Sequence, residues 1–163
     1  MSYQAVQDYF ERAGIADHIT EHEKTGDTVE HAAQTIGCAP AEIAKALSFL
    51  VNGSPVMVVM AGDAKVNNSK FKSCFHQKPV MIPWEQVENL IGHAPGGVCP
   101  FAVNEGVLVF LDVSLKRFSV IHTAAGTDMA TIRLTMAELE KHARAAGWVD
   151  VCKGWFVNEG VTV

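Results

Sequence analysis

The sequence has few of the features that build disulfide-rich, metal-binding or membrane proteins. Its four cysteines, Cys38, Cys74, Cys99 and Cys152, are far apart and form no Cys-x-x-Cys pair. This spacing argues against a structural zinc site and against disulfides, so we expect no metal. No apolar run approaches the roughly 20 residues that span a bilayer. The first residues, MSYQAVQDYFERAG, also lack the apolar core of a secretory signal, and we expect a cytoplasmic protein without membrane contact.

Basic residues are scarce as well. Lys and Arg number 13 against 18 Asp and Glu, which gives a formal net charge of −5. Proteins grip long nucleic acids with clustered Lys and Arg, so this balance argues against DNA as a partner. Contact with only the tip of a nucleic acid remains open. The acidic composition and the lack of a long apolar patch are consistent with a monomer or a weak dimer.

Several well-known functional signatures are missing. No strand leads into the glycine stretch GGVCPF, and it does not contain G-x-G-x-x-G, so a dinucleotide-binding turn is excluded. No Gly-Lys-Ser or Gly-Lys-Thr follows it, which excludes a P-loop. The segment HITEH is not the HExxH pattern of zinc proteases.

The apolar fraction of 48% over 163 residues is sufficient for one domain with a real core. Capping boxes are expected at Asp27–Glu30 and Thr135–Glu138, and Asn52-Gly53 predicts a hairpin turn. Short strands between helices, with at least one hairpin, indicate a mixed α+β domain. Periodicity predicts helices over 3–13, 27–36, 68–74, 84–91 and 135–145, a helical turn over 41–44, and strands over 18–22, 46–51, 55–60, 80–82, 107–111, 118–122, 130–134 and 148–152.

Lys45 is the first candidate functional residue. It lies in IAKALSFL, with apolar residues on both sides. Strand alternation places it on one face with Leu47 and Phe49, which we interpret as the inner face. An inward ammonium at the mouth of a strand can hold a carbonyl or phosphate oxygen. The alternative is an ordinary lysine whose side chain reaches the surface, and position alone favours that alternative.

Gly96 and Gly97 form the second candidate. They lie in IGHAPGGVCPF, after a predicted helix. Glycine permits a positive φ and a close backbone approach, which leaves N–H groups free to point at a ligand, and Pro100 stiffens the exit. N–H groups aimed at one point make an oxyanion hole or a carboxylate site. The alternative is a plain connecting loop, which the stretch by itself favours.

Cys99, beside these glycines, could act as a nucleophile with His93 or His122 as its base. A buried and unreactive cysteine is the other interpretation. His122 and Thr123 end a predicted strand before an Ala-Ala-Gly turn, and we expect them to line the same mouth as Lys45.

Five segments in order resemble one family. They are IAKAL, VMAGD, GGVCPF, VFLDVSL, and TAAGT followed by TIRLT. This order resembles the YbaK/ProX family of aminoacyl-tRNA deacylases, which are related to the editing domain of bacterial prolyl-tRNA synthetase. Each segment is weak alone, but the ordered set is fairly specific. The resemblance runs from about Thr28 to Leu139.

The resemblance implies a single compact α+β domain over residues 1–163, with a mixed, mostly antiparallel sheet curled around a pocket and flanked by helices. It implies hydrolysis of the ester that joins a wrong small amino acid to tRNA, often the proline tRNA, without a metal or organic cofactor. The family's pocket lysine matches Lys45, and its G-x-x-x-P motif matches Gly96–Pro100. We therefore expect catalytic roles for Lys45, Gly96 and Gly97, and substrate-binding roles for Val98, Cys99, Pro100, His122 and Thr123.

Three hypotheses follow. The leading one is a trans-acting aminoacyl-tRNA hydrolase that touches the acceptor end of tRNA, with a terminal ribose hydroxyl relaying the proton as the family implies. A tRNA synthetase is a second candidate partner. The alternative is a non-catalytic module that binds an aminoacyl group or a nucleotide end beside a synthetase. The third is a cysteine hydrolase that acts through Cys99. An enzyme should lose turnover when Lys45 is replaced, whereas a module should lose only binding.

Overall fold

A computed structural model describes residues 2–155. Residues 156–163, which lie beyond the predicted resemblance, are outside the described part. The α-helices are α1 (Ser2–Ala13), α2 (Val29–Ile36), α3 (Asn68–Phe75), α4 (Trp84–Ile91) and α5 (Met136–His142). The strands are β1 (Ile19–Glu21), β2 (Ala44–Val51), β3 (Ser54–Ala61), β4 (Lys65–Val66), β5 (Leu108–Asp112), β6 (Val120–Ala124), β7 (Ala130–Thr135), β8 (Gly147–Val149) and β9 (Cys152–Lys153). Short 3₁₀ turns cover Ala16–His18, Pro40–Glu42 and Val113–Arg117.

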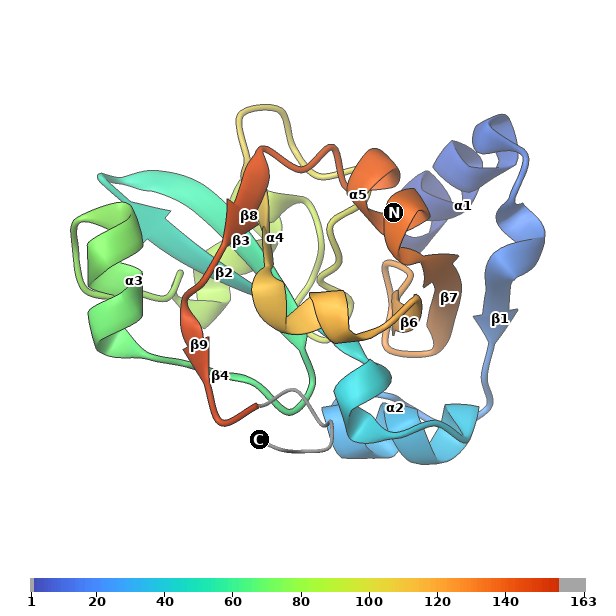
Figure 1. Cartoon of the computed structure of the whole chain (residues 1–163). Coiled ribbons are helices and arrows are strands. Elements are labelled where there is room, and N and C mark those ends of the chain that lie inside the picture. The colour runs from blue at the N-terminus through green and yellow to red at the C-terminus, as the bar shows by residue number, and fades with distance from the viewer. Residues whose placement is uncertain (1, 156–163) are drawn as a thin grey trace.

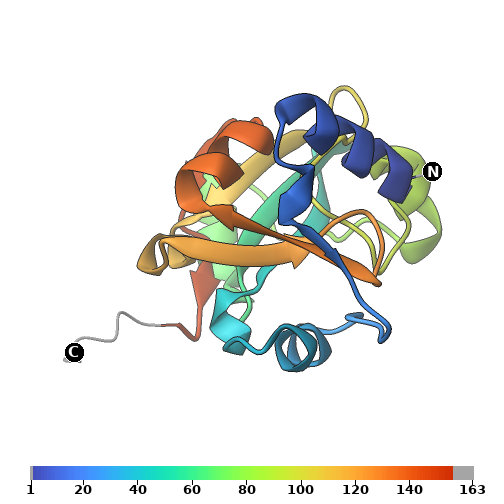
Figure 2. The same ribbon diagram turned by 90° about the vertical axis from the view of Figure 1, so that its right-hand side faces the viewer.

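The strands form three sheets, in the orders β2-β3-β5-β8, β1-β7-β6 and β4-β9 (Figure 1). The β3–β5 and β5–β8 pairs are parallel, and the other pairs are antiparallel. Figure 2 shows the three-stranded sheet between α1 and α5 on one side and α2 on the other. The predicted α+β fold with a mixed, mostly antiparallel sheet is confirmed, and the sheets do not close into a barrel.

The core is built on the β2–β3 hairpin. Asn52 and Gly53 have φ values of 51° and 79°, as the predicted two-residue turn requires. The run from Val56 to Ala61 has at most 4% exposure at any residue. β3 lies between β2 and β5, so its apolar residues are buried against neighbours on both sides.

The two larger sheets meet where β2 begins. Ile43 and His122 form an isolated parallel bridge. The buried Thr123 hydroxyl donates a hydrogen bond to the Ala44 carbonyl oxygen at 2.7 Å. These contacts join β6 to β2 without continuing into a ladder. The cavity described below lies beside this junction, because Ile43, Ala44 and Thr123 all line it.

Some local expectations were wrong. Thr28, not Asp27, caps α2, because its hydroxyl accepts the N–H of His31 at 3.1 Å. The turn expected over 41–44 is a 3₁₀ turn that ends at Glu42, and Ala44 already belongs to β2. Segment 80–82 makes only one bridge, between Met81 and Phe49, because prolines at both ends limit pairing.

The C-terminal elements also differ from the prediction. The Thr135–Glu138 capping box is confirmed. However, α5 ends at His142, because Arg144 takes a left-handed φ of 51°. The strand predicted over 148–152 is split into β8 and β9, and the Val151 N–H between them donates to the buried Asp112 carboxylate at 2.9 Å. Within residues 2–155, no helix is long and apolar enough to cross a bilayer.

Candidate active site

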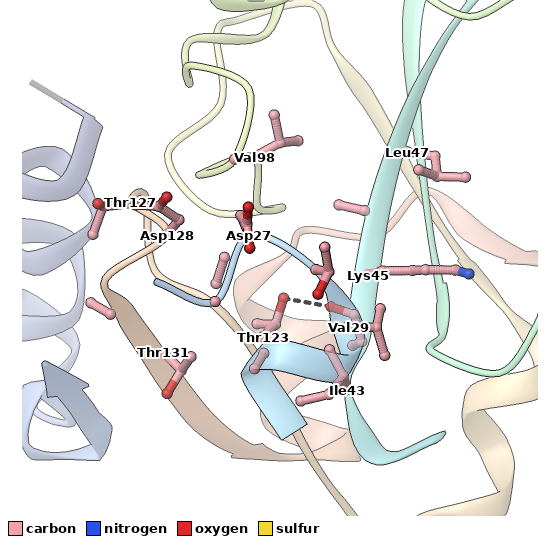
Figure 3. A pocket seen from close by; sticks show the side chains of 18 residues that line it. Asp27, Val29, Ile43, Lys45, Leu47, Val98, Thr123, Thr127, Asp128 and Thr131 are labelled. Atoms are coloured by element: carbon pink, nitrogen blue, oxygen red, sulfur yellow. Dashed lines mark hydrogen bonds between the residues drawn. The ribbon is translucent and has the colours of Figure 1, made fainter. Parts of the chain in front are cut away.

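A cavity of about 270 Å³ opens beside the junction of the two sheets (Figure 3). Its walls come from the start of α2, the first half of β2, the β6–β7 hairpin and the glycine stretch. Five of the residues that line it are alanines and two are glycines, so much of the space is bounded by small groups. The lining consists of residues 26–29, 32, 43–47, 96, 98, 123–124, 127–128 and 130–131.

The glycine stretch forms one wall through close backbone contact. Gly96 has a φ of 95°, which favours glycine. A Cβ added to Gly97 would lie 2.6 Å from the carbonyl oxygen of Gly126, so this position also requires glycine. The Gly97 N–H donates to the Ala94 carbonyl at 3.0 Å and closes a turn. Among the described residues, the N–H groups of Gly96 and Val98 have no hydrogen-bond acceptor, and both residues line the cavity.

The β6–β7 turn is supported from behind by the start of α1. The Ser2 hydroxyl donates to the Gly126 carbonyl oxygen at 2.6 Å. Gly126 has a φ of 91°, and a Cβ there would lie 2.7 Å from the Ser2 carbonyl oxygen. Three backbone segments are therefore stacked in direct contact, and the position of the glycine stretch depends on both of the others.

The segment before α2 is tied to the same hairpin. The Gly26 N–H donates to the Asp128 carbonyl at 2.6 Å, and the Thr25 hydroxyl donates to Oδ2 of Asp128 at 2.6 Å. His22 Nε2 lies 2.8 Å from the Thr131 hydroxyl. These contacts hold the polar segment 22–27 against the β6–β7 hairpin, and Gly26 and Asp27 of this segment line the cavity.

Two carboxylates therefore border the cavity. Asp27 and Asp128 both line it, and Figure 3 shows Asp128 on the hairpin turn and Asp27 beside it, below Val98. A hydrogen bond from His31 Nδ1, at 2.8 Å, lowers the pKa of Asp27 from its ordinary value. Neither residue was predicted from the sequence to belong to the site. Their only sequence signal is an acidic side chain in a polar connecting segment, which is common on protein surfaces.

Lys45 lines the cavity, but its ammonium lies elsewhere. Figure 3 shows the side chains of Lys45 and Leu47 pointing away from the two carboxylates, on the opposite side of β2. Lys45 Nζ donates a long hydrogen bond of 3.4 Å to the Gly62 carbonyl oxygen. Burial lowers the pKa of Lys45. The predicted alternation of side chains along β2 is right, but the cavity lies on the face of the strand that carries Ala44 and Ala46.

Cys99 is completely buried and lies outside the cavity lining. His93 Nε2 donates to the Phe101 carbonyl at 2.6 Å, so this nitrogen cannot also accept the Cys99 proton, although Sγ lies 3.6 Å away. Burial raises the pKa of Cys99 to about 12. These features oppose formation of a nucleophilic thiolate. Pro100, which is also buried, lies outside this lining and borders a separate groove next to α1.

His122 and Thr123, near the end of β6, lie on opposite faces of the strand. Thr123 lines the cavity and uses its hydroxyl to bind Ala44. His122 is half-buried and outside the lining, because successive residues of a strand face opposite sides. Burial, and secondly the nearby Arg133, lower the pKa of His122. Of the expected site residues, the structure brings together Lys45, Gly96, Val98 and Thr123.

Within residues 2–155, no three His, Cys, Asp or Glu side chains are grouped to hold a metal ion. The chemical groups present at the cavity are unpartnered backbone N–H donors, two carboxylates and small apolar side chains. Such a set can bind a carbonyl oxygen and a small cationic group at the same time.

The sequence profile of the aminoacyl-tRNA editing domain matches residues 23–142. The chain belongs to this family. The predicted resemblance is therefore confirmed over nearly the range expected. The chain is 42% identical to the uncharacterised protein YwhH of Bacillus subtilis over 156 residues, which cover 95% of this chain and 99% of that protein.

Proline–tRNA ligases are more distant relatives of this editing domain. Identity to the Bacillus licheniformis ligase is 24% over 151 residues, which are 92% of this chain but 26% of the ligase. Among solved structures, a candidate trans-editing enzyme for prolyl-tRNA synthetase superposes with a TM-score of 0.83 and 27% identity, covering 94% of this chain and 98% of that one. The hypothetical protein APE2540 gives 0.75 and 26%, covering 83% and 90%.

Proposed function

We propose that this editing domain is a trans-acting deacylase that hydrolyses the ester between a wrong small amino acid and tRNA, with proline tRNA as the carrier. The observation that best supports this proposal is a cavity lined largely by small side chains. Two backbone N–H groups at this cavity have no partner among the described residues, and the cavity lies in a domain of the aminoacyl-tRNA editing family. The similarity to a candidate trans-editing enzyme for prolyl-tRNA synthetase supports this carrier.

The reaction requires stabilisation of an oxyanion. Water adds to the ester carbonyl, the bond from the carbonyl carbon to the ribose oxygen breaks, and the ribose oxygen takes up a proton. We assign the N–H groups of Gly96 and Val98 as donors to the oxyanion, because the Gly97 N–H is already bonded to Ala94. One such donor is commonly worth about 3 kcal/mol of transition-state stabilisation. Gly97 contributes through backbone packing.

The carboxylates of Asp27 and Asp128 are assigned to the α-ammonium of the aminoacyl group. The bond from His31 makes Asp27 a weak base, so it is poorly suited to activate water. Thr25 fixes the Asp128 carboxylate and leaves Oδ1 without a partner among the described residues. Proton transfer from water is therefore assigned to a hydroxyl of the terminal ribose.

Lys45 is assigned to the phosphate of the terminal nucleotide. Its ammonium lies beyond the edge of the amino-acid cavity, and its one hydrogen bond within the described part of the chain is the long bond to Gly62, which an anion can replace. A phosphate oxygen gives a stronger, charge-assisted hydrogen bond than a neutral carbonyl. Lys45 would then hold the acceptor end while the ester lies at the N–H groups.

The test is deacylation of proline tRNA charged in turn with alanine, cysteine, serine, threonine and proline. Wild type should release one small amino acid and spare proline, and Lys45→Ala should be at least tenfold slower. Lys141→Ala, an exposed lysine on α5, is the matched control. Absence of release with enzyme in excess would refute the proposal for this tRNA. Retained binding of the charged tRNA would then favour a non-catalytic module.

A further inference from the structure

Lys65 and Lys153 face each other directly across the β4–β9 pair. Both residues are exposed. Like charges placed opposite each other on adjacent antiparallel strands destabilise a sheet. Such a pair in a chain with a formal net charge of −5 suggests that an anion lies against it in the functional state.

Lys45 approaches the same place from β2. Its ammonium points away from the amino-acid cavity (Figure 3) and lies within electrostatic range of Lys65 and of Cys152, the residue before Lys153. We call Lys45, Lys65 and Lys153 the lysine cluster. Lys65 links the other two members, because it is paired with Lys153 and lies within electrostatic range of Lys45.

Most acidic groups near the lysine cluster are already engaged. Arg117 holds Asp63 through two hydrogen bonds, of 2.6 and 2.9 Å, and Lys70 holds Asp150 at 3.0 Å. Glu30 on α2 is a further carboxylate in range of Lys45. Burial raises the pKa of Cys152 to about 12, so its thiol adds no negative charge at neutral pH. Among residues 2–155, a local excess of positive charge therefore remains.

The lysine cluster is next to the cavity but separated from it by β2. Figures 1 and 2 place the β4–β9 pair at the same end of the molecule as α2, which forms a wall of the cavity. The inference takes the nucleotide of an aminoacyl group in the cavity to pass β2 on the side that carries the Lys45 ammonium. The phosphates of a single-stranded 3′ end repeat along the chain and can engage several cations in turn.

We propose that the lysine cluster binds consecutive backbone phosphates at the 3′ end of the acceptor strand, with Lys45 nearest the ester and Lys65 and Lys153 farther along. This inference rests on the proposed function, because it takes the aminoacyl group to lie in the cavity. The lysine cluster is then the surface by which an acidic protein binds RNA without a long basic groove.

The test is binding of an RNA acceptor-stem hairpin with a single-stranded CCA end, measured by fluorescence anisotropy at several salt concentrations. The Lys65→Gln/Lys153→Gln variant should bind about tenfold more weakly at low salt. The magnitude of its slope of log K against log salt should fall by about 1.4, because each of the two lost phosphate contacts on a single strand removes about 0.7. Lys72→Gln/Lys141→Gln removes the same charge from exposed helix positions and should change neither quantity. Equal affinity and slope in wild type and the Lys65/Lys153 variant would overturn the inference.

A further measurement separates this inference from the proposed function. Hydrolysis of 3′-alanyl-adenosine, which lacks the backbone phosphates, should be the same in wild type and in the Lys65→Gln/Lys153→Gln variant. If wild type binds RNA through the lysines but hydrolyses no ester, the deacylase proposal alone fails.

Thermal unfolding of Lys65→Gln should show a melting temperature equal to or above that of wild type, because the repulsion between Lys65 and Lys153 is relieved. A lower one would overturn the explanation by like charges.

Discussion

Gly97 and Gly126 are in direct backbone contact: a Cβ on Gly97 would lie 2.6 Å from the Gly126 carbonyl oxygen and 2.8 Å from the Thr127 Cα. The contact joins the glycine stretch to the hairpin that carries Asp128, so the two walls of the cavity can move only together. Ser2, at the start of α1, contacts the other side of Gly126, so the position of the hairpin turn depends on α1 as well.

We predict that Gly97→Ala destabilises the protein by about 1–3 kcal/mol, the usual cost of overpacking. Deacylation should fall further than stability explains, because the N–H groups of Gly96 and Val98 are displaced. Gly147→Ala is the control, since it has a negative φ and no atom within 4 Å of the added Cβ. Chemical denaturation and single-turnover rates measure both effects. A Gly97→Ala variant with normal stability would contradict the packing shown by the structure.

Thr123→Val should cost about 1–3 kcal/mol of unfolding free energy, because it leaves the buried Ala44 carbonyl without the hydroxyl donor at 2.7 Å. Thr123→Ser keeps the hydroxyl and should recover most of that loss. Urea denaturation of the two variants makes the comparison. Equal stability of the valine and serine variants would show that the bond between β6 and β2 contributes little.

Asp128→Asn should reduce the preference for esters with a free α-amino group. Wild type should bind 3′-alanylamino-3′-deoxyadenosine at least tenfold more tightly than its N-acetyl form, as expected for a charge-assisted hydrogen bond. Asp128→Asn should bind the two forms almost equally. Glu105→Gln, which makes the same charge change outside the cavity, should behave as wild type. Isothermal titration calorimetry measures these affinities, and no preference in wild type would exclude the assigned role.

Cys99→Ala should keep most of the deacylase activity, because the thiol is buried and protonated. We expect a stability loss of about 1 kcal/mol, typical of a single core substitution. Iodoacetamide should modify Cys99 in the native protein far more slowly than in urea, as mass spectrometry can show. Loss of activity in a folded Cys99→Ala variant would return the cysteine-hydrolase hypothesis to first place.

Acid should destabilise the fold through three buried or half-buried histidines. Burial lowers the pKa of His93, His122 and His142. Below about pH 6.5 the unfolded chain therefore binds protons that the folded protein does not, and the free energy of unfolding falls as the pH decreases. His93 is completely buried and its Nδ1 has no partner among the described residues, so it should contribute strongly.

Thermal melts between pH 7.5 and 5 test this dependence. His93→Gln should reduce the slope with which the melting temperature falls as the pH decreases, because glutamine does not titrate. Glutamine can still donate a hydrogen bond to the Phe101 carbonyl. His76→Asn, at the exposed end of α3, should leave the slope unchanged. An unchanged slope in His93→Gln would place the pH dependence elsewhere.

The sequence predicted those parts of the fold that depend on local rules. Helix α4 begins after Pro83 and ends before Gly92 because proline suits a helix start and glycine a left-handed end, and the structure has these bounds. The Asn52-Gly53 hairpin follows from a similar preference for positive φ. Such signals are contained in a few adjacent residues.

The site was predicted less completely, because its geometry depends on distant segments. Alternation along β2 correctly grouped Lys45 with Leu47, but which face borders the cavity is decided by α2 and the β6–β7 hairpin. Asp27 and Asp128 are brought together by bonds between segments about a hundred residues apart, such as Thr25 to Asp128. No local pattern contains that information.

The position of β3 has a consequence for synthesis of the chain. One edge of β3 pairs with β2 inside a hairpin, but its other edge pairs with β5, which begins at Leu108. Until the ribosome has delivered β5, the uncharged run from Val56 to Ala61 keeps an open edge, the kind of segment that aggregates. Nascent or truncated chains that end before Leu108 should therefore be the species that depend on chaperones.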